Sequence, residues 1–175
     1  MKDKIEVVAN VVVILLAVVI GSVYLKDRFS PPRTQSNEVK AGDRLPRLDG
    51  WDWGAHDQTL VLALRKGCHY CEDSAPFYQR LAAKLQEDGS KSAMVAVFPD
   101  GANTVNEVMR SEGLSVHALP GVPLESLNVS GTPSLLLVDR GALVLNAWIG
   151  MLSPRQELEV MRAMSCHANS CREPT

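Results

Sequence analysis

Two cysteines separated by two residues, Cys68 and Cys71 in the segment CHYC, have the type and spacing to do chemistry. A cysteine thiolate is a nucleophile, and a second thiol one helical turn later can close a disulfide and release a mixed-disulfide partner. The segment lies between an apolar run and a helical pattern, so Cys68 is expected at a helix N-terminus, where unpaired backbone N–H groups and the helix dipole favour the thiolate. The pair therefore predicts thiol–disulfide exchange, with attack by Cys68 and resolution by Cys71.

Two neighbours and two other interpretations bear on this prediction. His69 can add positive charge near both sulfurs, and we expect His69 and Tyr70 to tune the redox potential. The other interpretations are a closed stabilising disulfide and half of a zinc site. A three-residue cystine ring removes little entropy from the unfolded chain, and a zinc site needs a second ligand pair that CHYC does not supply. We expect no bound metal and no other cofactor.

Apolar patterns predict the elements that must position the pair. Continuous apolar runs at residues 59–64 and 93–98 indicate two buried strands, which the right-handed crossover preference makes parallel. An apolar face with a spacing of four indicates a helix over residues 76–87. Later in the chain we expect a helix capped by Asn103 and ended by Gly113, followed by an extended piece in LSVHAL. Two hairpin strands are expected at 135–139 and 143–149. The last helix should have Ser153 as its cap and Pro154 at its first position, and its apolar face should carry Leu158, Met161 and Met164. This order, β-α-β-α-β-β-α, predicts an α/β fold around a mixed sheet.

A second short motif stands directly before the hairpin. Thr132 and Pro133 precede the apolar run LLLVD. A proline there removes one N–H group from the strand ladder, and X-Pro bonds are the ones that adopt the cis form readily. This position is therefore a candidate cis-proline, with an ordinary trans proline in a turn as the alternative.

These motifs, in this order, resemble the thioredoxin superfamily and, within it, the membrane-anchored TlpA-like thiol–disulfide oxidoreductases. The resemblance spans residues 42–163: CHYC resembles the active-site Cys-x-x-Cys, Pro76 stands where the family has a helix-kinking proline, and GTPSLLLVD resembles the cis-proline strand. The resemblance implies a thioredoxin-like fold, with Cys68 exposed beside a cis Thr132–Pro133 bond that shapes a substrate groove. It also implies an extracytoplasmic location.

Three positions depart from the family pattern. Gly67 replaces the usual tryptophan before the first cysteine, Leu62 replaces the buried acid of thioredoxins, and Ser74 replaces the helix glutamate of many TlpA-like reductases. Proton handling at the second cysteine must therefore differ. Glu72 and Asp73 are near in sequence, but both are expected to face water on the first helical turn.

The N-terminal part of the sequence predicts a membrane anchor. Residues 7–25 form an uncharged apolar run of about 28 Å as a helix, close to the thickness of a bilayer core, and longer than the apolar region of a cleaved signal peptide. Basic residues flank both ends, so the positive-inside rule does not decide the orientation. We expect residues 1–6 as a flank, 7–25 as a signal anchor in the lipid bilayer, 26–41 as a flexible tether, 42–165 as the thioredoxin-like domain and 166–175 as a tail.

The tail carries the remaining cysteines, Cys166 and Cys171. The favoured interpretation is a structural disulfide in an oxidising compartment. A second redox pair, and a metal site that adds His167, remain as alternatives.

With 18 basic and 20 acidic side chains, the chain has no broad cationic surface for nucleic acid. We therefore expect a single-pass protein of the cytoplasmic membrane whose domain faces the periplasm or extracytoplasmic space. Its expected partners are the thiols and disulfides of exported proteins and a separate thiol donor or acceptor of electrons. The alternatives are a redox-inactive binding or assembly module, motivated by the missing acids, and a metal chaperone.

Overall fold

The computed structural model of this chain describes residues 38–87 and 91–165. The predicted anchor at 7–25, most of the predicted tether and the cysteines of the tail lie outside these residues. Within the described ranges, no helix combines the length and the apolar character that crossing a membrane requires.

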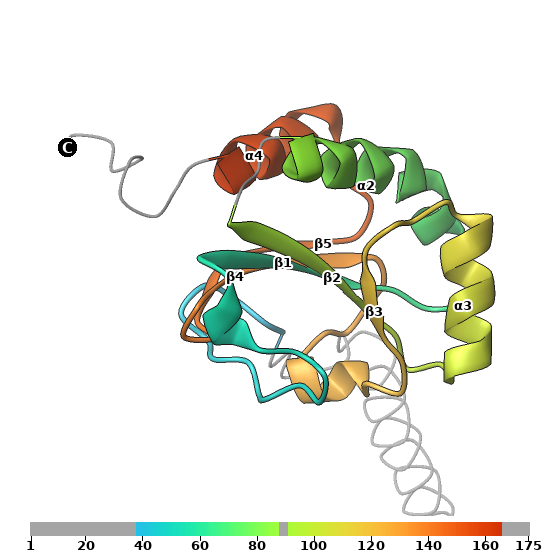
Figure 1. The fold of residues 1–175 in the computed structure, drawn as a ribbon, viewed down its shortest axis with the longest axis horizontal. Coiled ribbons are helices and arrows are strands. Elements are labelled where there is room, and N and C mark those ends of the chain that lie inside the picture. The colour runs from blue at the N-terminus through green and yellow to red at the C-terminus, as the bar shows by residue number, and fades with distance from the viewer. Residues whose placement is uncertain (1–37, 88–90, 166–175) are drawn as a thin grey trace, which may run out of the picture. The chain divides into compact units, whose positions relative to one another are not determined.

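The described part of the chain is built on a five-stranded mixed sheet with the strand order β3-β2-β1-β4-β5 (Figure 1). The central strand β1 (Gln58–Ala63) pairs in parallel with β2 (Ser92–Val97), which pairs in parallel with β3 (His117–Leu119). On its other side β1 pairs antiparallel with β4 (Ser134–Asp139), which forms a hairpin with β5 (Val144–Ile149). All six residues of β1 are buried, as expected for a strand covered on both faces.

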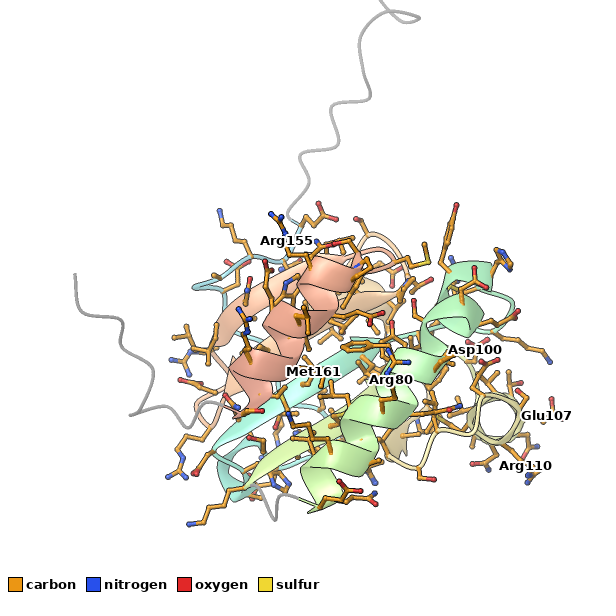
Figure 2. The ribbon with its side chains drawn as sticks, turned by 90° about the horizontal axis from the view of Figure 1, so that it is seen from above. Arg80, Asp100, Glu107, Arg110, Arg155 and Met161 are labelled. Carbon is orange, nitrogen blue, oxygen red and sulfur yellow. A yellow bond between two sulfur atoms is a disulfide. The ribbon has the colours of Figure 1, made fainter. Side chains whose placement is uncertain are left out.

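Three helices cover one face of the sheet. They are α2 (His69–Glu87), α3 (Ala102–Ser111) and α4 (Pro154–Ser165). Their buried side chains pack with Leu60 and Leu62 of β1 in one apolar cluster. Figure 2 shows α4, which carries Met161, running alongside α2, which carries Arg80, with α3 beyond α2.

The other face of the sheet is covered by irregular chain. The segment from Val39 to Leu48 and two short 3-10 helices, η1 (Trp53–Ala55) and η2 (Leu124–Leu127), pack there against Val61 and Ala63 of β1. Helices on one face and loops on the other leave the carboxyl end of β1 open toward the start of α2.

Most predicted elements are confirmed, with several differences in detail. LSVHAL contains the short strand β3, which the predicted element order omitted. Helix α3 begins earlier than predicted, with Gly101 instead of Asn103 at its N-cap and no side-chain capping bond. On α4 the fully buried residues are Val160 and Met164, whereas Leu158 is 55% exposed.

The two tryptophans before β1 lie in irregular chain and in a 3-10 helix, outside the strands. Trp53 lies in η1 and is buried, and its indole N–H donates to the Pro46 carbonyl at 3.3 Å. Trp51 lies outside any strand and stacks against both His56 and His117. These histidines thus pack on an aromatic ring.

The folded part begins before residue 42. Val39, which the predicted boundary places in the tether, is 4% exposed, and its N–H donates to the Asn128 carbonyl at 2.9 Å. This residue belongs to the core under the sheet because its side chain joins the cluster that includes Leu45 and Leu127.

Candidate active site

Cys68 and Cys71 form a disulfide at the junction between β1 and α2, with their Cα atoms 5.2 Å apart. Gly67, with φ of +69°, turns the chain directly before Cys68, a conformation that residues with a Cβ atom rarely adopt. Cys68 is half-buried, whereas Cys71 is 8% exposed. Of the two sulfurs, that of Cys68 is therefore the one open to an attacking or leaving partner.

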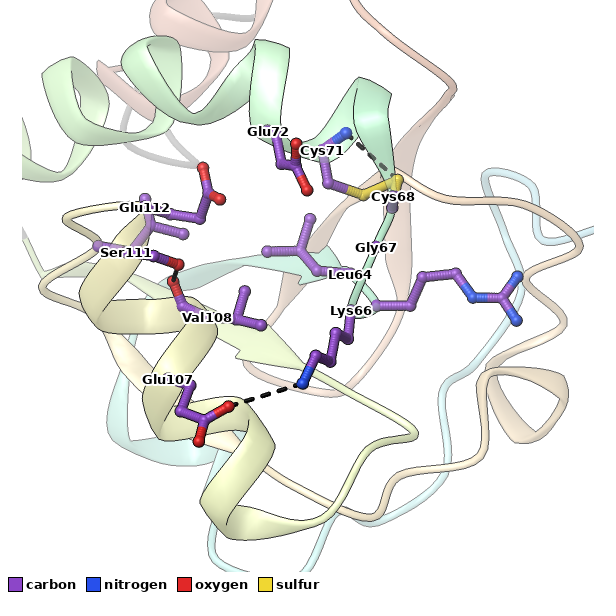
Figure 3. A pocket seen from close by; sticks show the side chains of 12 residues that line it. Leu64, Lys66, Gly67, Cys68, Cys71, Glu72, Glu107, Val108, Ser111 and Glu112 are labelled. Atoms are coloured by element: carbon purple, nitrogen blue, oxygen red, sulfur yellow. Dashed lines mark hydrogen bonds and ion pairs between the residues drawn. A yellow bond between two sulfur atoms is a disulfide. The ribbon is translucent and has the colours of Figure 1, made fainter.

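Two hydrogen bonds converge on the sulfur of Cys68. The backbone N–H of Cys71 donates to it at 3.2 Å, and the hydroxyl of Thr132 lies 3.4 Å from it (Figure 3 shows the first). The Cys68 sulfur thus occupies the place of an N-cap acceptor at the start of α2, where free N–H groups also point. When the pair is reduced, these donors and the helix dipole favour a thiolate on Cys68 over one on Cys71.

The loop before β4 brings a distant motif to the same sulfur. The Thr132–Pro133 peptide bond is cis, as the sequence suggested. The Pro133 carbonyl accepts a hydrogen bond from the Gly150 N–H at 2.7 Å, which ties this loop to the end of β5. The Ser134 hydroxyl donates back to the Gly131 carbonyl at 2.7 Å. These contacts hold Thr132 beside Cys68, although 64 residues separate the two in the sequence.

Leu62 of β1 and Ser74 of α2 stand where the sequence departs from the acidic pattern of the proteins that it resembles. Leu62 is fully buried in the apolar cluster, and the Ser74 hydroxyl donates to the Tyr70 carbonyl at 2.7 Å. Pro76 lies inside the helix and supplies no N–H to it. Neither Leu62 nor Ser74 places a carboxylate behind the disulfide.

Tyr78 adds a second unusual group to α2. Its side chain is fully buried, and its hydroxyl has no hydrogen-bond partner among the described residues. The pKa of Tyr78 is raised to about 12, mainly by burial. The nearby Ser74 hydroxyl lowers this pKa, and the charge of Glu157 raises it. The Ser74 hydroxyl donates its hydrogen to the Tyr70 carbonyl, and the geometry between the Ser74 and Tyr78 hydroxyls is not that of a hydrogen bond. The phenol therefore stays protonated at neutral pH.

The two residues between the cysteines point outward. Tyr70 is 57% exposed, and the His69 ring lies 3.3 Å from the Asp73 carboxylate one turn later. Both members of that pair are largely exposed, so their interaction is weak. His69 and Tyr70 stay candidates for tuning the redox potential, and Asp73 faces water as predicted.

A cavity of about 330 Å³ opens beside Cys71, between the start of α2 and the end of α3 (Figure 3). Leu64 forms part of its wall, and Lys66 pairs with Glu107 at 3.6 Å at its far end. The charged or sulfur-bearing residues that line it are Arg65, Lys66, Cys68, Cys71, Glu72, Glu107 and Glu112.

Glu72 was expected to face water, and this expectation is incomplete. Its side chain is exposed, but it lines the cavity next to Cys71. Glu112, at the end of α3, lines the same cavity, and Figure 3 shows both carboxyl groups reaching into the space between the two helices. Burial raises the pKa of Glu112, and the charge of Glu72 raises it further.

Comparison with known proteins identifies the architecture. No protein-family model matches the chain, and no curated protein does. A solution structure of a thiol:disulfide interchange protein from Bacteroides sp. is similar with a TM-score of 0.60 at 14% identity, over 77% of this chain and 96% of that one. The thioredoxin domain of a thiol-disulfide oxidoreductase from Bacteroides vulgatus is similar with a TM-score of 0.59 at 16% identity, over 73% and 99%. The chain has a thioredoxin-like fold.

A third solved structure, a thiol-disulfide isomerase from Corynebacterium glutamicum, shares the thioredoxin-like fold with a TM-score of 0.55 at 12% identity, over 73% of this chain and 93% of that one. As the resemblance implied, the disulfide at the start of α2 and the cis Thr132–Pro133 bond lie close together in this chain. The predicted fold is thereby confirmed in the described part of the chain.

Sequence reasoning missed one residue that lines the cavity beside Cys71. Glu112 lies 41 positions after Cys71 and belongs to no motif, and only the packing of α3 against α2 brings it to the cavity. Its position directly before the helix-ending Gly113 was the one available signal, because it fixes the carboxylate at a helix end. Cys166 and Cys171 lie outside the described residues. Among those described, no three His, Cys, Asp or Glu side chains are placed to hold a metal ion.

Proposed function

We propose that this chain is a thiol–disulfide oxidoreductase that exchanges disulfides with other proteins through Cys68 and Cys71. The observation that carries the proposal is the environment of the Cys68 sulfur, which is accessible, bonded to Cys71 and within hydrogen-bonding reach of the Cys71 N–H and the Thr132 hydroxyl. A purely structural disulfide gains nothing from donors aimed at one of its sulfurs, whereas a leaving or attacking thiolate is stabilised by them.

The mechanism follows from the difference between the two sulfurs. In the reducing direction, the Cys68 thiolate attacks a substrate disulfide and forms a mixed disulfide, and one substrate sulfur leaves as a thiolate. Cys71 then attacks the Cys68 sulfur, which closes the intramolecular disulfide and releases the second substrate thiolate. Two electrons pass to the substrate, and the reverse sequence oxidises a dithiol.

The loop at Thr132 and Pro133 supplies the surface for the partner chain. Its backbone lies beside Cys68, where an extended substrate segment could pair with it. Exported proteins are the proposed substrates, with a separate thiol partner as donor or acceptor of electrons. The support is the apolar segment at residues 7–25, whose length suits a membrane anchor. The resemblance to TlpA-like oxidoreductases implies that the anchored domain lies outside the cytoplasm.

The first test is a redox titration of the full-length chain in glutathione and dithiothreitol buffers, with the thiols of each cysteine-containing peptide read by mass. We expect the Cys68–Cys71 pair to open and close reversibly. A potential of about −250 mV or lower would assign a reductase, and one near about −120 mV an oxidant. If the pair does not close, or only Cys166 and Cys171 do, the proposal is wrong.

The second test traps partners. Cys71→Ser removes the resolving thiol, so mixed disulfides should accumulate on Cys68 in membranes of cells that express the full chain. Cys68→Ser is the matched control and should trap none. If neither variant traps a partner, the binding-module interpretation takes the place of the oxidoreductase. Alkaline extraction of membranes and labelling of the domain with an impermeant thiol reagent test the anchor and its orientation.

A further inference from the structure

The resolving cysteine needs a proton acceptor that this chain does not hold at the usual positions. Cys71 is 8% exposed, so its thiol must lose a proton in a mostly desolvated place before it can attack. Leu62 carries no acid, the Ser74 hydroxyl is committed to Tyr70, and Tyr78 is a neutral phenol at neutral pH. Whatever accepts the proton must lie on the open side of Cys71.

The open side of Cys71 is the cavity of about 330 Å³, and two carboxylates line it. Glu72 reaches it from the first turn of α2 and Glu112 from the end of α3 (Figure 3). The volume is several times that of a water molecule, so a short water chain fits between the thiol and a carboxylate.

Glu112 is held in place by the way α3 ends. The Leu114 N–H donates to the Met109 carbonyl and the Gly113 N–H to the Arg110 carbonyl, with Gly113 at φ of +60°, which is a Schellman motif with Glu112 as the C-cap. The Gln79 amide of α2 also donates to the Glu112 carbonyl at 2.6 Å. These bonds fix the end of α3 against α2 and thereby direct the Glu112 side chain.

The two carboxylates sit at helix ends of opposite polarity. The C-terminal end of α3 disfavours a negative charge on Glu112. The pKa of Glu112 is raised, with burial as the first cause and the charge of Glu72 as the second. Glu112 is thus suited to take up a proton beside Cys71, and the nearby charge of Glu72 contributes to this.

Two of the other charged groups near the cavity are paired with partners other than Glu72 and Glu112. Lys66 is engaged with Glu107 at 3.6 Å at the far end. His69 is paired with Asp73 on the outer side of α2. Arg65 lines the cavity as the one remaining described cation there.

We propose that Glu112, assisted by Glu72, accepts the proton of the Cys71 thiol when the mixed disulfide is resolved and returns it when the Cys68–Cys71 bond is reduced. This role rests on the proposed function. In resolution, the proton moves from the Cys71 sulfur to the carboxylate, the new thiolate attacks the Cys68 sulfur, and the bond between Cys68 and the substrate breaks. The substrate leaves as a thiolate and takes a proton from solvent.

The test follows the oxidation of the reduced full-length chain by glutathione disulfide, quenched with acid and read by mass. In the unaltered chain the glutathione adduct on Cys68 should resolve rapidly. In Glu112→Gln we expect the adduct to accumulate and its resolution to slow about 10-fold at pH 6 to 7, less than the full loss of an acid–base group because solvent reaches this carboxylate. The two rates should converge above about pH 9, where the thiol ionises unaided.

Three further variants make the result specific. Glu159→Gln on α4 removes the same charge from an exposed position and should leave the pH profile unchanged. Glu107→Gln on α3 removes a carboxylate that lines the same cavity but is paired with Lys66, so it tests a general charge effect and should slow resolution much less than Glu112→Gln does. Glu112→Asp keeps a carboxylate and should recover part of the rate, and it decides the question if Glu112→Gln does not fold.

If Glu112→Gln resolves the adduct with the same pH profile as Glu159→Gln, the role of Glu112 is wrong, while the oxidoreductase proposal stands. If the unaltered chain forms no adduct on Cys68, the proposed function itself fails. A slowing of equal size in Glu107→Gln would also overturn the specific role, since it would show a general effect of charge near α2.

Discussion

The polar and reactive groups at the two ends of strand β1 differ in how far they are buried and hydrogen-bonded. At its start, the buried Gln58 amide donates to the Ser92 hydroxyl and to the Ala163 and Met164 carbonyls, at 3.0, 3.1 and 3.1 Å. At its carboxyl end, past Leu64, the chain turns at Gly67 into a disulfide that faces a cavity and a loop. At the start of β1 the N–H groups of the Gln58 amide are hydrogen-bonded, whereas beyond its carboxyl end the Cys68 sulfur is accessible.

This contrast separates stability from chemistry within one element. The two carbonyls to which Gln58 donates belong to the last turn of α4, and the last four carbonyls of an α-helix have no partner within the helix. Gln58 therefore ties the end of α4 to the sheet. The carboxyl end of β1 carries a half-exposed sulfur whose partners can change during a reaction. Substitutions at the two ends should accordingly affect different measurements.

The largest expected effect is at the chemical end. Cys68→Ser removes the attacking sulfur and should lower the reduction of a test disulfide such as insulin by about 10³-fold or more. Its free energy of unfolding, measured with urea in reducing buffer, should stay within about 0.5 kcal/mol of the reduced parent chain. A large loss of stability in this variant would contradict the separation of roles.

The next effect is at the structural end. Gln58→Leu keeps the side-chain volume roughly but removes the Gln58 donor from the Ala163 and Met164 carbonyls and leaves the Met164 carbonyl with only the longer bond from the Ser92 hydroxyl at 3.4 Å. The variant should therefore destabilise the fold by about 2 kcal/mol while the reaction rate at low temperature is unchanged. Gln79→Leu is the matched control, because this exposed glutamine makes a single bond to the Glu112 carbonyl. Its cost, followed by the same urea unfolding, should be below about 1 kcal/mol. Equal costs in the two variants would remove the contrast.

A smaller effect is expected in how stability depends on pH. The folded-state pKa of Glu112 is raised, so its contribution to stability is present below the unfolded pKa near 4.5 and is lost as pH rises through the folded pKa. Relative to the parent chain, Glu112→Gln should therefore become more stable between pH 4 and pH 7. Because Glu112 is half-buried and solvent screens part of its charge, the gain should be no more than about 0.5 kcal/mol. Urea titrations at both pH values measure it, and a change of the opposite sign would contradict the raised pKa.

The smallest effect is expected at the outer side of α2. Asp73→Asn removes the exposed pair with His69 and should change the free energy of unfolding by less than about 0.5 kcal/mol. The variant also tests His69 as a tuning residue. A shift of the Cys68–Cys71 potential in the same redox titration would support a tuning role of His69. An unchanged potential would show that the His69–Asp73 pair does not tune it.

The sequence by itself determined the features that depend on neighbours in the chain. Apolar runs gave the buried strands, the spacing of CHYC placed Cys68 at a helix start, and Ser153 with Pro154 began the last helix. These signals are readable because strand burial, helix periodicity and capping act over a few residues. The cis bond before Pro133 was expected from the neighbouring motifs and the resemblance they carry, because its local type alone favours an ordinary trans proline, and it is present in the structure.

Only the tertiary structure decided which polar groups serve stability and which face the chemistry. Gln58 meets the carbonyl of Ala163 across 105 positions, and Glu112 meets the cavity of Cys71 across 41. In the sequence both read as ordinary polar residues. Their roles arise from packing between elements, which no local period encodes, because the end of a helix gains its neighbours only when the sheet and its covering helices come together.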